Sequence, residues 1–386
     1  MWHRFFDFLS SLKLTVVCLS LAMVLVFVGT MAQVNFGIHE VQHRYFQSLL
    51  VWWPVSGQGL KIPVFPGGHL LGGVLLLNLL AAHVRRFRWS WSKLGIQLTH
   101  AGLIVLLAGM LFTDLLSVES YMRLAPGETK NYSEDSLAVE MVLIGGEDAA
   151  TDQVIAIPEA RLAQGGVVAI EGLPFQVVVR RFYPNSRLQA LGSDDARGMP
   201  AATQGDGSHA AVVELPKATA QNDRSLRSVV VEIVPSTGPS LGTWLVSDQL
   251  ENPQTFSHAG KPWQMLMRSA RYYKPYSLTL NKFTHERYPG TQIPKNFATQ
   301  AVLADPERNE NRDVLIYMNH PLRYRGETYF QSGFEDNDTV TILQVVYNPS
   351  FVTPYVACIL VSVGLIFQFS YHFFGFLRRR KTAHAQ

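Results

Sequence analysis

Residues 14–32 read LTVVCLSLAMVLVFVGTMA, an apolar run without a charged side chain. A helix of this length crosses the hydrocarbon core of a bilayer. No small-residue cleavage site with a mature polar sequence follows it, so we expect a retained span rather than a signal peptide. Three further runs share this character, at about 69–84, 94–116 and 354–377. The sequence therefore predicts a membrane protein with four transmembrane α-helices.

The composition agrees with a membrane protein and excludes several other classes. Only 16% of the 386 residues are charged, whereas soluble proteins carry about a quarter. The net charge of +3 is too balanced for a nucleic-acid binder, so we expect no nucleic-acid partner. Both cysteines, Cys18 and Cys358, lie inside apolar runs. A disulfide scaffold, a CxxC redox site and a zinc site with cysteine ligands are therefore excluded.

Basic residues indicate the orientation, because lysine and arginine concentrate in cytoplasmic loops. They occur in the N-terminal segment 1–13, and they cluster in the link 85–93 and the tail 378–386. We therefore expect both termini and this link in the cytoplasm. The loop 33–68 and the segment 117–353 then lie on the periplasmic side of an inner (cytoplasmic) membrane.

The segment 117–353 contains short apolar runs rich in β-branched residues, separated by glycine, proline and asparagine. Several alternate between apolar and polar residues, which is typical of strands. The pattern predicts a large, mostly antiparallel β domain, a sandwich or a barrel. The glycine- and alanine-rich stretch 191–209 is expected to be a flexible excursion. The runs are 137–144, 175–182, 211–215, 229–234, 276–283, 314–318 and 339–347.

The loop 33–68 carries an apolar stripe at helical spacing, which predicts an interfacial amphipathic helix on the outer membrane surface. The stripe consists of Ile38, Val41, Tyr45, Leu49 and Trp52.

The same loop contains His39-Glu40-Val41-Gln42-His43, which matches HExxH. Two histidines four residues apart on a helix can bind zinc, with the glutamate as base. A metalloprotease also needs a third ligand and an enclosing domain, and this short loop between two spans offers neither. We therefore interpret the motif as the polar face of the interfacial helix. We predict no metal site there, and the chain contains no other catalytic motif.

His100 lies about six residues into the third run, roughly 9 Å along the helix axis. An ionisable group inside a membrane is costly and points to function. Its ring can bind a haem iron or hydrogen-bond a neighbouring helix, and both readings stay open. His83 and His69 end the second run on its cytoplasmic and outer sides, where a boundary position accounts for each. His83 and His100 share the inner half of the membrane, so a haem between two histidines is also possible.

Glycines recur every seven residues along the third run, at Gly95, Gly102 and Gly109. Small residues at this spacing predict a seam on which another helix packs closely. His100 lies off this seam.

Several separated passages share a pattern. Near the N-terminus, residues 8–15 read FLSSLKLT and residues 27–33 read FVGTMAQ. In the third run, Lys93-Leu94-Gly95 leads to Thr99-His100-Ala101-Gly102. Late in the chain, residues 319–326 read NHPLRYRG, residues 329–332 read YFQS and residues 345–350 read VVYNPS. In this order they resemble the ResB (CcsB) family of cytochrome c biogenesis proteins. Residues 145–270 carry no motif of the family.

The resemblance implies a role in the System II pathway. There the protein works with a CcsA-type membrane partner to move haem across the membrane and attach it to CxxCH thiols of apocytochrome c. The family's membrane histidine falls on His100, which makes haem, held transiently and shared with the partner, the expected cofactor. The partner's tryptophan-rich segment is matched neither by Trp52-Trp53-Pro54 nor by Trp89-Ser90-Trp91. The chain is thus expected to be one subunit of a synthetase and not a self-sufficient enzyme.

Two other readings stay open. A b-type cytochrome subunit would hold a permanent haem between His83 and His100. A membrane-anchored adaptor would bind a partner through its β domain and hold no haem.

The topology makes a direct prediction. A reporter fused at Ala220 should be active only as an outside marker, and one fused after Lys381 only as an inside marker, because basic clusters stay in the cytoplasm. Paired alkaline phosphatase and fluorescent-protein fusions measure this, and the opposite pattern would overturn the orientation.

Overall fold

The computed structural model describes residues 2–54, 61–87, 89–148, 151–191, 199–216, 225–291, 294–335 and 339–383. They form two units. The described residues up to Val118 and from Tyr347 onward form a helical unit, and those between Glu119 and Val346 form a β unit. Four long apolar helices and a large antiparallel β unit confirm the fold class expected from the sequence.

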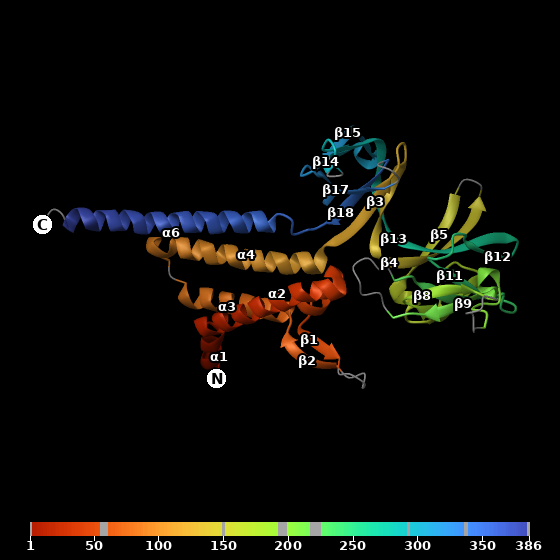
Figure 1. The fold of residues 1–386 in the computed structure, drawn as a ribbon, viewed down its shortest axis with the longest axis horizontal. Coiled ribbons are helices and arrows are strands. Elements are labelled where there is room, and N and C mark those ends of the chain that lie inside the picture. The colour runs from red at the N-terminus through yellow and green to blue at the C-terminus, as the bar shows by residue number, and fades with distance from the viewer. Residues whose placement is uncertain are drawn as a thin grey trace. The chain divides into compact units, whose positions relative to one another are not determined.

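The helical unit contains four helices of the described residues that are long and apolar enough to cross a membrane. α4 lies between α6 and α3, and α3 also packs against α2 (Figure 1). Most of their residues are not buried within the chain, as expected for helices surrounded by lipid. The chain is therefore a membrane protein. The helices are α2 (Leu12–Val41), α3 (Gly68–Arg86), α4 (Leu94–Leu116) and α6 (Thr353–Ala383).

The predicted glycine seam is confirmed as the contact between α4 and α6. A Cβ atom at Gly95 would lie 2.6 Å from the carbonyl oxygen of Gly364, and one at Gly102 would lie 2.7 Å from Val361. Gly109 approaches Thr353 in the same way. Only glycine permits this approach of the two backbones.

A polar cluster joins the N-terminus to α3. The short helix α1 (Trp2–Leu9) ends just before Ser11, and the buried Asn78 of α3 lies opposite this break. The Asn78 amide donates to the carbonyl oxygens of Leu9 at 2.6 Å and Ser11 at 3.1 Å, and the Thr15 hydroxyl donates to Asn78 at 2.7 Å. The polar residues of FLSSLKLT therefore surround a helix break whose backbone groups would otherwise lack partners in the bilayer.

The prediction of an interfacial helix within 33–68 is wrong for most of this loop. α2 continues to Val41 across a kink at Gly37 (φ 73°), a π-turn follows at Gln42–Phe46, and a hairpin of β1 (Leu50–Pro54) and β2 (Lys61–Pro66) takes the rest. The stripe divides because Val41 and Tyr45 pack inward with Leu25, Val51 and Leu71, whereas Leu49 and Trp52 lie exposed beyond the turn.

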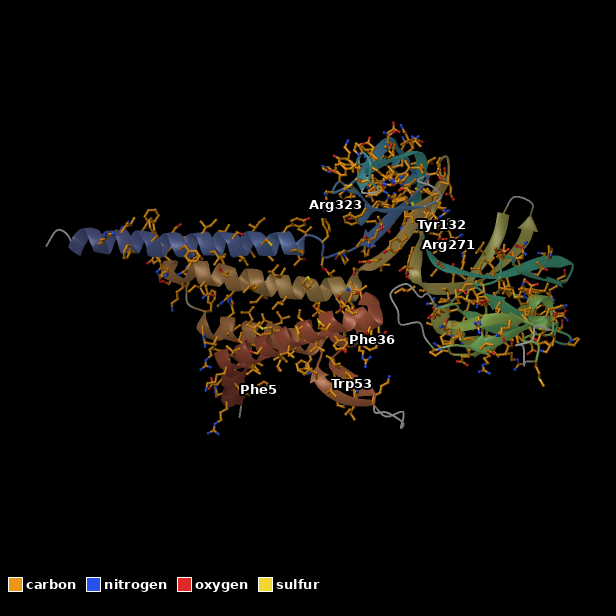
Figure 2. The ribbon with its side chains drawn as sticks, in the orientation of Figure 1. Phe5, Phe36, Trp53, Tyr132, Arg271 and Arg323 are labelled. Atoms are coloured by element: carbon orange, nitrogen blue, oxygen red, sulfur yellow. The ribbon has the colours of Figure 1, made fainter. Side chains whose placement is uncertain are left out.

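Instead, an amphipathic helix occurs at the N-terminus. α1 exposes Phe5 (Figure 2) and also Phe8, and an Asp7–Arg85 ion pair of 2.7 Å connects it to α3. Exposed phenyl rings on a short helix at the end of a span suit the membrane surface.

The β unit is built on one large antiparallel sheet with the order β15-β14-β13-β4-β3-β18-β17-β16, to which β5 and β12 add. A second sheet has the order β11-β10-β7-β6, and β8 pairs with β9. The strands are β3 (Val118–Leu124), β4 (Thr129–Asp148), β5 (Thr151–Pro158), β6 (Gly166–Val168), β7 (Phe175–Tyr183), β8 (Ser186–Ala190), β9 (Ala210–Glu214), β10 (Ser228–Pro235), β11 (Gly242–Ser247), β12 (Gln254–His258), β13 (Lys261–Arg287), β14 (Pro294–Asp305), β15 (Glu310–Tyr317), β16 (Leu322–Tyr324), β17 (Glu327–Glu335) and β18 (Val340–Tyr347).

Two hydrophobic cores share the long strand β13. The first half of β13 packs with β7, β10 and β11, around Phe175 and Trp263, and the second half packs with β14 to β18, around Leu278 and Tyr329. Register shifts after Ser269 and Tyr273 mark the change from one core to the other. Beside them the Arg271 guanidinium lies 4.1 Å from the ring centre of Tyr132 (Figure 2), a cation–π contact.

The expectation of a flexible excursion over 191–209 is wrong for its second half. Residues 192–198 lie outside the described residues, but Ala202 is buried and Gln204 pairs with Trp244 of β11. Its second half therefore belongs to the fold.

The glycine seam can be tested with a matched pair of alanine variants. Gly102→Ala should destabilise the chain by about 1–3 kcal/mol, because the new methyl group overpacks the α4–α6 contact. Gly72→Ala in α3 meets nothing within 4 Å and should be neutral or stabilising by up to about 1 kcal/mol. Thermal unfolding in detergent measures both; equal effects would contradict the seam.

Candidate functional site

The structure brings His83 and His100 together. Their ring centres lie 6.3 Å apart with an interplanar angle of 72°, and both side chains are partly buried. His100 is two residues from Gly102, which is about 200° around α4. Because the glycine face is occupied by α6, His100 is held toward α3 and meets His83 there.

One nitrogen of this pair has no partner. Nδ1 of His83 is buried, and no described residue accepts or donates a hydrogen bond to it. Buried polar atoms are almost always paired in native proteins, so an exception calls for an explanation. A ligand that binds between the two rings would supply one.

A second pair lies at the opposite end of the same two helices. Nε2 of His69 lies 2.6 Å from Oδ2 of Asp114, and the Gln47 amide donates to the other carboxylate oxygen, also at 2.6 Å. His69 precedes His83 by two heptads, and Asp114 follows His100 by two heptads. Each helix thus carries both its polar groups on nearly one face, about 21 Å apart along the axis.

The His83–His100 pair suits an iron centre, and the His69–Asp114 pair suits a structural contact between the two helices. Imidazole nitrogens are the commonest protein ligands of haem iron. Each binds a metal ion at about 2 Å, and two rings that share one ion have their centres on the order of 6 Å apart, near the observed 6.3 Å. Nε2 of His69, in contrast, is already engaged by the carboxylate of Asp114. The structure therefore favours His100 with His83, and not His69, as the candidate haem ligands.

The HExxH motif lies where α2 gives way to the π-turn, which starts at Gln42. Among the described residues no group of three potential metal ligands is assembled. The side chain of His39 lies outside the described part of the chain. That His39 and His43 bind no zinc stays a prediction.

The comparisons with known proteins point to one family. The model of the ResB-like family matches residues 242–342, from β11 into β18. The match extends into residues 242–270, where the sequence alone shows no motif of the family. Protein NrfI of Wolinella succinogenes is 32% identical over 92 residues, which make up 24% of this chain and 10% of NrfI. Residues 242–342 of the chain are thus similar to the ResB-like family. The aligned segment represents only a tenth of the length of NrfI.

The ResB-like segment contains a polar network that organises the second core. The Tyr324 hydroxyl donates to Asp305 at 2.6 Å and to Glu310 at 2.8 Å, and burial together with these carboxylates raises the pKa of Tyr324 to about 12. Arg325, in the left-handed region at φ 45°, donates to Asp305 at 2.9 Å. The signature NHPLRYRG thus stabilises a tight turn and the end of the sheet.

A second network lies deeper in this segment. Tyr276 and Tyr329 are hydrogen-bonded to each other at 2.8 Å and both bond to Glu327, which also pairs with the buried Lys274 at 2.6 Å. Burial and the nearby carboxylate raise the pKa of both tyrosines. His320 lies apart on the surface, stacked on Tyr317 with ring centres 4.2 Å apart, after Asn319 in the left-handed region. These residues have structural roles in the ResB-like segment.

Sequence reasoning missed two features of the helical unit. His69 was interpreted as a boundary residue, although its carboxylate partner could have been found from the equal two-heptad spacings of His69–His83 and His100–Asp114. Asn78 was not singled out, although an asparagine in an apolar run needs a polar partner.

The two histidines of α3 should respond oppositely to leucine. His83→Leu should leave the melting temperature unchanged or higher, because it removes a buried nitrogen without a partner. His69→Leu should destabilise the chain by about 1 kcal/mol, because the partly solvated Asp114 loses its His69 partner and keeps only the Gln47 amide. Thermal unfolding of the haem-free chain in detergent compares them. A large loss of stability in His83→Leu would show that its ring is structural.

Proposed function

We propose that the chain is a membrane component of cytochrome c biogenesis that takes haem as its substrate between His83 and His100. It then acts with a CcsA-type partner to deliver haem for covalent attachment to the CxxCH thiols of apocytochrome c. The observation that carries this proposal is the pair of histidine rings in the apolar helices, with centres 6.3 Å apart and one buried nitrogen that has no partner among the described residues. The match of residues 242–342 to the ResB-like family supports the same role.

The proposal includes an orientation. Both termini and the α3–α4 link lie in the cytoplasm, and the β unit lies on the periplasmic side of the inner membrane. The basic residues Arg85 and Arg86 at the end of α3 support this assignment. His83 and His100 then lie in the inner half of the bilayer, where haem arriving from the cytoplasm first meets the helices.

The chain contributes binding and positioning and not a reaction of its own. Thioether formation joins a substrate thiol to a haem vinyl group and depends on their alignment. Both cysteines of this chain lie in the membrane spans, so the thiols come from the apocytochrome. In this proposal His100 and His83 hold the iron, and the β unit offers the surface on which the apocytochrome is held.

A b-type cytochrome is a second candidate, because the same pair of histidines favours it. Such a protein would retain stoichiometric haem with a stable redox spectrum in the isolated chain. A haem carrier would release its haem to partner and substrate.

His100 variants test the proposal in a deletion strain. His100→Ala should lower covalently bound haem in exported c-type cytochromes at least about tenfold, because a ligand to the iron is lost. Added imidazole should restore part of the output, since it can enter the gap left by the side chain. Haem staining of separated periplasmic proteins measures the output, with His69→Ala as the matched control in the same helix pair.

The outcomes separate the candidates. His100→Gln can hydrogen-bond a neighbouring helix but is a poor iron ligand, so full activity of this variant would show that His100 is structural. Normal cytochrome maturation in the deletion strain, together with permanent haem in the purified chain, would favour the b-type cytochrome. Normal cytochrome maturation in the deletion strain, with no haem in the purified chain, would favour a membrane-anchored adaptor.

A further inference from the structure

The link between α3 and α4 exposes large aromatic rings beside its basic residues. Phe87 is 50% exposed, Trp89 86% and Trp91 75%. A hollow of about 110 Å³ lies against Trp89 and Trp91, lined also by Leu94 and Gln97. An exposed apolar surface of this kind at the end of a span marks a place where a membrane or an apolar ligand binds.

These rings continue into the histidine pair. The ring centres of Trp89 and Phe87 lie 6.5 Å apart, those of Phe87 and His83 5.8 Å, and those of His83 and His100 6.3 Å. Each step is within the roughly 4.5–7 Å over which aromatic rings interact. A line of four rings therefore leads from the most exposed tryptophan of the link to His100.

Two arginines at the end of α3, Arg85 and Arg86, lie next in sequence to Phe87. Arg86 is close enough to His100 to act on it electrostatically, while Arg85 is engaged by Asp7 at 2.7 Å and Ser10 at 2.9 Å. Haem is a flat apolar ring with carboxylate groups at one edge. It would stack on the aromatic rings and find its counter-charge in Arg86.

We propose that Phe87 and Trp89 form a porphyrin-docking surface from which the His83–His100 pair is loaded. This inference rests on the proposed function, because it takes haem as the substrate of that pair. Stacking on Trp89 captures the porphyrin at the exposed link, and Phe87 keeps its face in contact until the iron reaches His83. The docking residues thus govern the rate of loading, and the histidines govern the final bound state.

Loading kinetics test this directly. Haem is added to the haem-free full-length chain in detergent, and the absorbance of histidine-bound haem is followed by stopped flow. Trp89→Ala and Phe87→Ala should each slow loading about fivefold or more, because a stacking contact is lost. With excess haem the final spectrum should equal that of the wild type, because the histidines are intact.

Two control variants sharpen the test. Trp89→Phe keeps a flat ring and should load at nearly the wild-type rate. Trp52→Ala removes another exposed tryptophan, 45% exposed on the β1–β2 hairpin, and should change nothing. Unchanged loading in both Trp89→Ala and Phe87→Ala would overturn the docking surface. If Trp89→Ala and Trp52→Ala slow loading equally, the tryptophans act only as membrane anchors, and the proposal is also wrong.

The design separates this inference from the proposed function. Loss of the histidine-bound spectrum in His100→Ala, with wild-type loading in Trp89→Ala, would refute only the docking surface. An unchanged spectrum in His100→Ala would refute the proposed function. Metal-free protoporphyrin IX then reports on docking alone, since it cannot be ligated: its quenching of tryptophan fluorescence should fall in Trp89→Phe relative to the wild type.

Discussion

The close approach of α4 to α6 is the constraint on which the helical unit depends. At Gly95 and Gly102 the two backbones are so near that a methyl group would collide with the opposite helix. Packing of this kind determines the rotation of α4 about its own axis. With the glycine face committed to α6, the opposite face carries His100 and Asp114 toward α3. Gly95, Gly102 and Gly109 therefore determine which residues of α4 face α3.

The α3–α4 contact is consequently polar at both ends and looser than the α4–α6 contact. At one end His69 and Asp114 contact each other, whereas at the other end Nδ1 of His83 has no hydrogen-bond partner among the described residues. His69 and His83 in α3 are fourteen residues apart, as are His100 and Asp114 in α4. One polar residue of each helix therefore meets one of the other helix at both ends of the contact. A closed pair at one end fixes the register of the helices, so the pair at the other end can remain open for a ligand.

Sequence reasoning located the spans and most strands, because hydropathy and alternation depend on local residues alone. It also located His100 and the glycine seam, since an ionisable group and a seven-residue repeat stand out inside an apolar run. It did not anticipate the hairpin at Leu50–Pro54, because the helical stripe there is interrupted by tertiary packing of Val41 and Tyr45. Nor did it pair His69 with Asp114 or His83 with His100 outright, because which faces of two helices meet is decided by a third helix.

The position of the β unit in the chain affects how the protein is made. α4 ends at Leu116 and α6 begins at Thr353, so the tightest helix contact joins segments separated by the whole of the β unit. Ribosomes deliver chains from the N-terminus, and domains generally fold as they emerge. α4 must therefore wait in the bilayer, with its glycine face exposed to lipid, until all of the β unit has been synthesised. Folding of the β unit shortens the effective distance between the ends of α4 and α6 and so reduces the entropy lost on their association. Folding of the β unit therefore favours the association of α4 with α6, the contact that also orients His100 toward α3.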